Sequence, residues 1–363
     1  MARHVRQLTQ GGIDGESRMT RCISRRLMLA GGGAAAVAMP RAASADLVAL
    51  EQAAAREATL TWYIAQVDAE SAEALGRIFT RQYPAINVAV IRTTGQVAYQ
   101  RLMQDLKNNA PQCDVFSTTD IAHMPALKDR GALAQYVPQN AAGLLPQFQR
   151  LADPGYHYPN SATNHFIIYN TDKLHAADAP RSWADLLDSK WQRQIALPHP
   201  AFSGCGGVWA LDLRKLYGWS YFEKLANNNP RIGRSFTDPV SLVTAGECVL
   251  GAAPANGAFP AIAKGNPIGI VYPADGCSVC VGPSGIPASA PHPNAARLFM
   301  EFLLSETYSR LSLDRGSEPL RAGIAPLPGR KSIEQLTVIE LSVPEIRRGI
   351  PEVIEQWRDT FGN

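Results

Sequence analysis

Stretches with helical spacing of apolar residues alternate with short apolar runs along most of the chain. Apolar residues at every third or fourth position predict helices at 47–57, 68–84, 96–109 and 123–133. Runs rich in β-branched and aromatic residues predict the strands between them, at 58–65, 86–94 and 113–119. This alternation is typical of an α/β fold in which helices flank a mostly parallel sheet.

A second block of alternating elements begins near residue 158. Strands are predicted at 165–174, 194–200, 249–257 and 269–276, and helices at 182–188, 208–218, 219–228 and 238–247. A strong helix is predicted over 294–312. We therefore expect two lobes, one of residues 46–157 and 278–363 and one of residues 158–277, joined by two crossover segments that act as a hinge.

Polar loops mark the predicted binding region, because ligands of such sheets bind beyond the carboxyl ends of the strands. In the first lobe these loops are 65–71, 92–96 and 117–120, and in the second lobe "SGCGG" (203–207) precedes a helix. The first N–H groups of a helix lack intrahelical acceptors, and glycines let an oxyanion approach them closely. Ordinary turns and a plain strand-to-helix corner have the same composition, so they are the alternative to a binding site.

Residues 1–45 have the features of a secretory signal. A basic stretch precedes an apolar, Ala- and Gly-rich segment, and the small residues Ala43 and Ala45 suit cleavage near Ala45. The paired arginines in "SRRLML" favour the twin-arginine route. We expect a periplasmic mature protein without membrane insertion, since no later stretch approaches eighteen apolar residues. A disordered cytoplasmic tail is the alternative.

The charge of the chain changes when the predicted signal is removed. The full sequence has 35 basic and 32 acidic residues, a net charge of +3. The signal contains seven arginines and two acids, which leaves 28 basic and 30 acidic residues and a net charge of −2. The mature chain has no basic run interleaved with aromatic residues, so nucleic acid is not an expected partner.

Five cysteines remain after the predicted cleavage, at 113, 205, 248, 277 and 280. An odd number leaves at least one free thiol in an oxidising compartment. Cys277 and Cys280 form "CSVC", which is compatible either with a local disulfide or with two buried thiols. A metal site would need a second such pair or a histidine cluster, and the sequence has neither. We expect no cofactor.

Three segments carry a resemblance to a known family: "SWADLLDSKWQRQIALPHPAFSG", "YGWSYFEKLANNNPRIGRSFTDPVSLVTAGE" and "HPNAARLFMEFLLSE…GSEPLR". They resemble periplasmic solute-binding proteins of ABC importers, in the branch that includes ferric-iron binders and binders of phosphorylated or phosphonate-like solutes. The resemblance covers about residues 60–341. It implies a type II-like clamshell of two α/β lobes with mixed sheets and a ligand cleft between them. It also implies that the bound ligand is delivered to a permease and its ATPase.

The residues that match the iron ligands of that family are Val67, Thr119, Asn256 and Gly257. None supplies a hard anionic or imidazole ligand, so iron binding would need non-standard ligands. Ser203-Gly204-Cys205 matches a run that holds phosphate in the relatives, which implies a small solute with a phosphate, phosphonate or carboxylate group. We expect a monomer with these ligand-binding residues: Gln66, Thr94, Gly95, Thr118, Thr119, Ser203, Gly204, Cys205, Thr237, Asn256, Gly257, Tyr272 and Asp275.

The sequence also leaves other interpretations open. Tyr63, Tyr272 and Phe202 could form walls of the cleft, and Asp275 could receive an ammonium or hydroxyl group. Cys205 could be a nucleophile with His165 or His199 as base, or part of a soft-ligand site, but no cysteine-protease signature surrounds it. The same clamshell could also be a sensor subunit that feeds a receptor kinase.

Overall fold

The computed structural model describes residues 40–362, so the predicted signal and its twin-arginine motif before Pro40 lie outside the described residues. Helix α1 (Pro40–Glu57) begins before the predicted cleavage site at Ala45. Within this part of the chain, no helix is long and apolar enough to cross a membrane.

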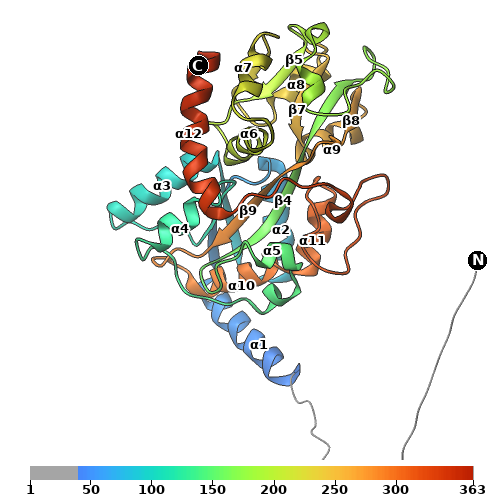
Figure 1. Cartoon of the computed structure of the whole chain (residues 1–363). Helices are drawn as coiled ribbons and strands as arrows, with labels where there is room; N and C mark the ends of the chain where they lie inside the picture. The colour runs from blue at the N-terminus through green and yellow to red at the C-terminus, as the bar shows by residue number, and fades with distance from the viewer. Residues whose placement is uncertain (1–39, 363) are drawn as a thin grey trace, which may run out of the picture. The chain divides into compact units, whose positions relative to one another are not determined.

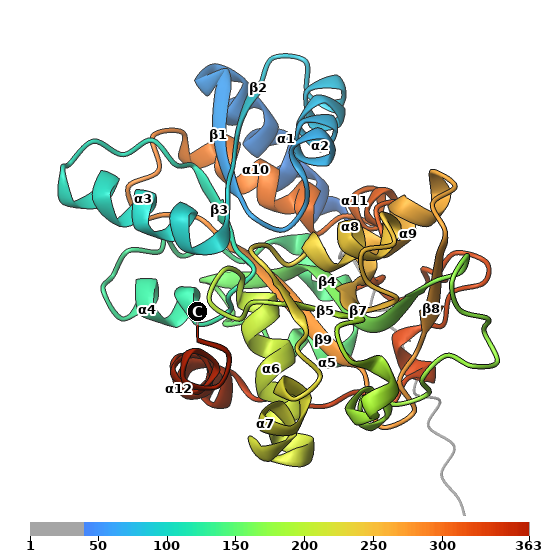
Figure 2. The same cartoon turned by 90° about the horizontal axis from the view of Figure 1, so that it is seen from above.

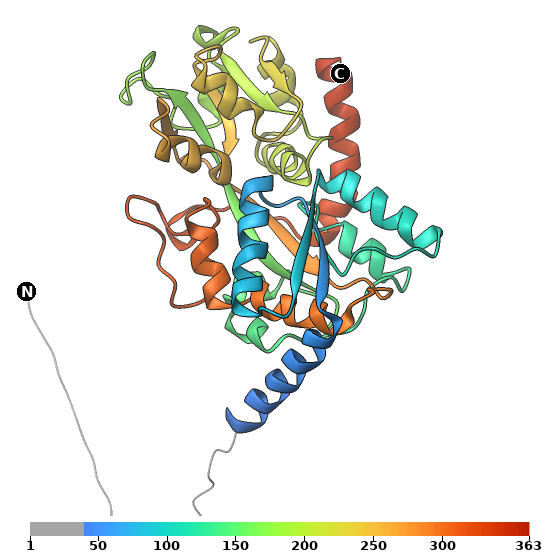
Figure 3. The ribbon, with the colours of Figure 1, turned by 180° about the vertical axis from the view of Figure 1, so that it is seen from behind.

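The first lobe is built on three parallel strands in the order β2-β1-β3. They are β1 (Thr59–Ile64), β2 (Asn87–Arg92) and β3 (Val115–Ser117). Figure 3 shows α2 lying along β2. The helical segments of this lobe are α1, α2 (Ala69–Gln82), α3 (Gly95–Lys107), α4 (His123–Lys128), η1 (Gln139–Gly143), α5 (Pro146–Gln149), α10 (Pro293–Leu303), α11 (Glu306–Leu313) and η4 (Ile333–Gln335).

Two antiparallel strands carry the sheet from the first lobe into the second (Figure 1). They are β4 (His157–Asn170) and β9 (Ser278–Gly285). β9 pairs with β3 of the first lobe at one end, while the far half of β4 pairs with β7 and β8 of the second lobe. The expected crossover segments are therefore strands of one continuous sheet, and β9 is a strand that the sequence analysis did not predict.

The second lobe contains β5 (Ile195–Pro198), β6 (Arg231–Gly233), β7 (Leu250–Pro254) and β8 (Ile268–Val271). β5 pairs in parallel with both β6 and β7. The helical segments are η2 (Ala184–Leu187), η3 (Ser189–Trp191), α6 (Gly204–Tyr217), α7 (Ser220–Ala226), α8 (Asp238–Thr244), α9 (Ala255–Ala263) and α12 (Val343–Phe361). The mixed sheet with helices on its faces confirms the predicted fold class.

Each lobe has its own aromatic core. In the first, Phe299 of α10 packs against Trp62 and Phe79, with ring centroids 4.9 Å apart in both pairs. In the second, Trp209 of α6 and Trp357 of α12 are packed around Phe222. Separate cores let the lobes move as units, because they are joined by β4, β9, the segment between η4 and α12, and contacts across the cleft.

Helix α12 differs from its predicted place. The predicted lobe division assigned residues 278–363 to the first lobe, but α12 packs against α6 and α7 of the second lobe (Figure 2). Its apolar stripe, Ile346, Ile350, Val353 and Trp357, is buried in the second core. The other predicted residue boundaries of the lobes stay a prediction.

Two predicted helices have a different form. The single helix expected over 294–312 is two helices, α10 and α11, and the Ser305 hydroxyl caps the second by accepting from Tyr308 N. The segment 182–188 forms only the short 3₁₀ turn η2. A reciprocal cap precedes it: Asp185 N donates to Ser182 Oγ at 3.2 Å and Ser182 N donates to Asp185 Oδ2 at 3.1 Å.

Candidate ligand-binding cleft

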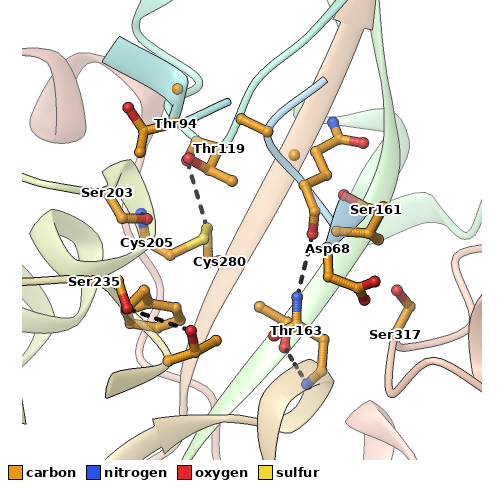
Figure 4. Close-up of a pocket in the computed structure, with 18 of the residues that line it drawn as sticks. Asp68, Thr94, Thr119, Ser161, Thr163, Ser203, Cys205, Ser235, Cys280 and Ser317 are labelled. Atoms are coloured by element: carbon orange, nitrogen blue, oxygen red, sulfur yellow. Dashed lines mark hydrogen bonds between the residues drawn. A yellow bond between two sulfur atoms is a disulfide. The ribbon is translucent and has the colours of Figure 1, made fainter. Parts of the chain in front are cut away.

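A cavity of about 300 Å³ is lined by residues of both lobes (Figure 4). The first lobe contributes the loops that follow β1, β2 and β3, and the second contributes the first turns of α6 and α9 and the loop before α8. Ser161 and Thr163 of β4, Cys280 and Gly282 of β9, and Arg315 and Ser317 after α11 (Glu306–Leu313) complete the wall. The binding region expected from the polar loops is therefore a real cavity.

The cavity brings together part of the predicted site. The predicted residues that line it are Gln66, Thr94, Gly95, Thr119, Ser203, Cys205, Thr237 and Asn256. The predicted residues that do not line it are Thr118, Gly204, Gly257, Tyr272 and Asp275. Thr118 is fully buried, and its hydroxyl lies 2.9 Å from His123 Nδ1. Asp275 accepts from Tyr217 and from Ala184 N outside the cavity.

Of the aromatic residues expected in the wall, only Phe202 lines the cavity, and Phe236 was not predicted. Tyr63 is buried in the first lobe, where its hydroxyl donates to Asp105. Tyr272 packs edge to face on Phe166, with ring centroids 4.8 Å apart. These two tyrosines belong to the packed interior and not to the cavity wall, because their rings pack against other side chains beside the sheet.

Besides α2, which Asp68 caps, two more long helices begin at the cavity with a capped N-terminus. Thr94 caps α3 by accepting from Val97 N at 3.4 Å. Ser203 caps α6 by accepting from Cys205 N at 3.2 Å. Each cap satisfies one N–H group, and the others of the first turn have no intrahelical acceptor. These unpaired N–H groups place the positive ends of the α3 and α6 dipoles at the same cavity.

Gly204 serves close packing between the lobes. A Cβ atom at this position would lie 2.6 Å from Cα of Asp120 and closer still to the carbonyl oxygen of Thr119. Thr119 and Asp120 belong to the first lobe, whereas α6 belongs to the second. Asn256 Nδ2 makes a further contact across the cleft by donating to Gln66 O at 3.2 Å. The lobes are therefore in contact on both sides of the cavity.

The cavity wall includes a disulfide between Cys205 of α6 and Cys280 of β9. The hypothesis of a Cys277–Cys280 bond is therefore wrong, and Cys277 is a buried free thiol, as are Cys113 and Cys248. The Cys280 sulfur lies 3.5 Å from Thr119 O of the first lobe. The bond fixes the first turn of α6 to a strand that both lobes share.

Three charged residues of the cavity were missing from the predicted site: Asp68, Arg92 and Arg315. Arg92 Nε donates to Val67 O at 2.9 Å, and Arg315 Nη1 donates to Leu311 O at 2.7 Å. Two guanidinium groups against one carboxylate give the cavity lining a formal charge of +1. This balance favours an anionic guest.

The residues that match the family's iron ligands do not form a metal site. Val67, Thr119 and Asn256 line the cavity, but Gly257 faces the methyl groups of Thr237 and Val240. Within residues 40–362, no group of three His, Cys, Asp or Glu side chains could hold a metal ion. The donors in the cavity are hydroxyls, amides and guanidinium groups, which suit an oxyanion better than Fe(III).

A family model described as "Bacterial extracellular solute-binding protein" matches residues 110–320, which is more than half of the chain. The chain belongs to this family. A protein of Salmonella paratyphi A named "Putative 2-aminoethylphosphonate-binding periplasmic protein" is 28% identical over 285 residues, which cover 73% of this chain and 76% of that protein. The predicted family resemblance is thereby confirmed.

Solved structures of two-lobe periplasmic binding proteins share the fold of this solute-binding protein. AfuA from Actinobacillus pleuropneumoniae, with fructose-6-phosphate bound, has a TM-score of 0.75 and 20% identity and covers 84% of this chain and 98% of its own. Iron-bound HitA from Pseudomonas aeruginosa has a TM-score of 0.71 and 22% identity and covers 83% of this chain and 99% of its own. The similarity spans both lobes.

In the solute-binding protein, the disulfide also removes the free Cys205 thiol that the enzyme hypothesis required. Cys205 has no thiol while it is bonded to Cys280, so it is not a nucleophile in this state. His165 is buried, its Nδ1 lies 2.8 Å from Ser278 Oγ, and burial lowers the pKa of its imidazole to about 3. His199 is also buried, where its ring packs against Phe202 and Trp357.

Glu318 makes the stability of the solute-binding protein depend on pH. Asn164 Nδ2 donates to its carboxyl group at 2.8 Å, and burial raises the pKa of Glu318 to about 7, although the charge of Arg330 opposes the shift. The folded state thus favours the protonated acid. Its contribution to the free energy of unfolding is complete below the ordinary pKa of 4.5 and is lost as the pH rises through about 7.

We therefore expect Glu318→Gln to match the parent near pH 4.5 and to exceed its free energy of unfolding by on the order of 2 kcal/mol at pH 8. Urea unfolding at both pH values measures this difference. Glu334→Gln, at an exposed position, is the control and is expected to show no such change. A Glu318→Gln effect that is equal at the two pH values would contradict the assignment.

Proposed function

We propose that the solute-binding protein captures a small solute with a phosphonate or phosphate-monoester group between its lobes and delivers it to an ABC permease. In this role it is an exported, periplasmic monomer and not an enzyme. Closure around the solute completes the site, because the polar groups of the two lobes meet the ligand together only when the lobes are closed.

One observation carries the proposal: the first turns of α3 and α6, from different lobes, point into the same positively charged cavity. A tetrahedral oxyanion has enough acceptor oxygens for several of these N–H groups at once. Hydroxyl groups of Thr94, Thr119 and Ser203 lie at the same side of the cavity (Figure 4). The printed name of the Salmonella relative, which includes a phosphonate ligand, supports the same class of solute.

Calorimetry and thermal shift with a panel of compounds test the proposal. The panel contains alkylphosphonates, sugar phosphates, succinate, spermidine and Fe(III). A bound solute stabilises the folded state by mass action, so we expect phosphonates or phosphate monoesters to raise the melting temperature. If only succinate, only spermidine or only Fe(III) raised it, the proposal would be wrong.

Arg315 is expected to contribute to the affinity for such an oxyanion. Among residues 40–362, only its Nη1 has a hydrogen-bond partner, Leu311 O, which leaves the rest of the guanidinium group for a ligand. Loss of a charge-assisted hydrogen bond costs about 1.5–3 kcal/mol, so Arg315→Gln should weaken binding by about 10- to 100-fold. Arg310→Gln is the matched control, because Arg310 is exposed and pairs with Glu306 on α11. Equal affinities of the two variants would remove Arg315 from the site.

A further inference from the structure

We infer that the end of the cleft around Asp68 binds a protonated amine, so that the solute has an oxyanion at one end and an ammonium group at the other. The inference rests on the proposed function and deepens it. Figure 4 shows the division: Asp68, Ser161 and Ser317 lie on one side of the cavity, opposite Thr94, Ser203 and Cys205.

The Asp68 carboxylate is held in a fixed position at the N-terminus of α2. It accepts from Ser71 N at 2.8 Å and from Ser71 Oγ at 2.7 Å. Burial alone would raise the pKa of Asp68, but these hydrogen bonds and the charge of Arg92 outweigh it and lower the pKa. Two carboxylate oxygens accept about four hydrogen bonds, so Asp68 keeps ionised acceptor capacity for a guest.

Two serine hydroxyl groups line the same cavity as this carboxylate. Ser161 and Ser317 are 8% and 6% exposed and line the cavity, and neither hydroxyl has a hydrogen-bond partner among residues 40–362. Gly282 on the neighbouring strand leaves the room that the Ser161 hydroxyl fills, since a Cβ there would meet Ser161 Oγ and lie 2.7 Å from Gln66 Nε2. A hydroxyl group that faces the cavity without a protein partner can accept a hydrogen bond from a ligand.

The number and charge of these acceptors fit an ammonium group. It donates three hydrogen bonds, and Asp68, Ser161 and Ser317 offer three acceptor side chains. A phosphonate dianion with an ammonium group has a net charge of −1, which neutralises the +1 of the cavity lining. A solute with a second anionic group would bring a negative charge against the Asp68 carboxylate.

The test compares solutes that share the phosphonate and differ in the other end. The probes are 2-aminoethylphosphonate, ethylphosphonate without the amine, and phosphonoacetate with a carboxylate, measured by calorimetry. We expect the full-length protein to bind the aminophosphonate at least 10-fold more tightly than either of the others. Asp68→Asn should reduce the affinity for the aminophosphonate to near that for ethylphosphonate, and should not weaken the binding of ethylphosphonate.

Asparagine is as good an N-cap as aspartate, so the variant keeps α2 capped. Glu73→Gln on the exposed face of α2 is the matched control and should not alter selectivity. Equal binding of the aminophosphonate and ethylphosphonate, or tighter binding of a sugar phosphate, would overturn the inference and leave the proposed function intact. If no phosphonate and no phosphate monoester bound, the proposed function itself would fail.

Discussion

Removal of the Cys205–Cys280 disulfide should lower the free energy of unfolding by about 2–4 kcal/mol and also weaken solute binding. The bond joins positions 75 residues apart, so breaking it gives the unfolded chain a large gain in conformational entropy. In the folded protein it ties the first turn of α6 to β9. Without it, the N–H groups of that turn are free to move relative to the rest of the cleft, and ordering them on binding costs affinity.

Urea unfolding and calorimetry on the oxidised protein, the reduced protein and the Cys205→Ala/Cys280→Ala variant measure both effects. We expect reduction by dithiothreitol to lower the stability and affinity of the parent to those of the variant. The variant itself supplies the control, because the reductant should change nothing in it. Alkylation of the unfolded, unreduced protein should modify Cys113, Cys248 and Cys277 but not Cys205 or Cys280. If the reductant changed neither the stability nor the affinity of the parent, this role of the disulfide would be contradicted.

The pairing of Cys205 with Cys280 shows what local sequence patterns leave out. Spacing suggested a bond between Cys277 and Cys280, but this stretch is extended and rises about 3.3 Å per residue, which puts the two Cα atoms about 10 Å apart. A disulfide needs Cα atoms within about 7 Å. Cys205 comes within 5.2 Å only because the long strand β9 runs beside α6. That strand was itself missed, because its small residues, Gly282, Pro283 and Gly285, have loop composition.

The residues that line the cavity could be predicted from the sequence where a strand is followed by the capping residue of a helix. Thr94 and Ser203 follow strands and precede glycines, and both cap helices that begin at the cavity. Arg315 could not be predicted from the polar loops, because it follows helix α11 and not the end of a predicted strand. Asp68 does have a local signal, since it precedes Ser71 by three residues in a polar loop and caps α2.

Gly204 is the position at which one added methyl group should act most strongly on binding. The contact between Gly204 and the first-lobe residues Thr119 and Asp120 exists only while the lobes are together, since it joins backbone atoms of different lobes. A Cβ there would have to displace backbone, which cannot give way as a flexible side chain can. Alanine should therefore raise the free energy of the closed conformation and leave the separated lobes nearly unchanged.

We expect Gly204→Ala to weaken solute binding by about 5- to 150-fold, since overpacking of this kind costs about 1–3 kcal/mol. Stability of the unliganded protein should stay close to that of the parent, because alanine is at least as favourable as glycine in a helix. Calorimetry and thermal unfolding without solute measure the two quantities. Gly257→Ala is the matched control: the nearest atoms to its Cβ would be side-chain carbons of its own lobe, at 3.2 to 3.5 Å. Unchanged affinity of Gly204→Ala with lost stability would mean that this contact persists without solute and that the lobes do not separate there.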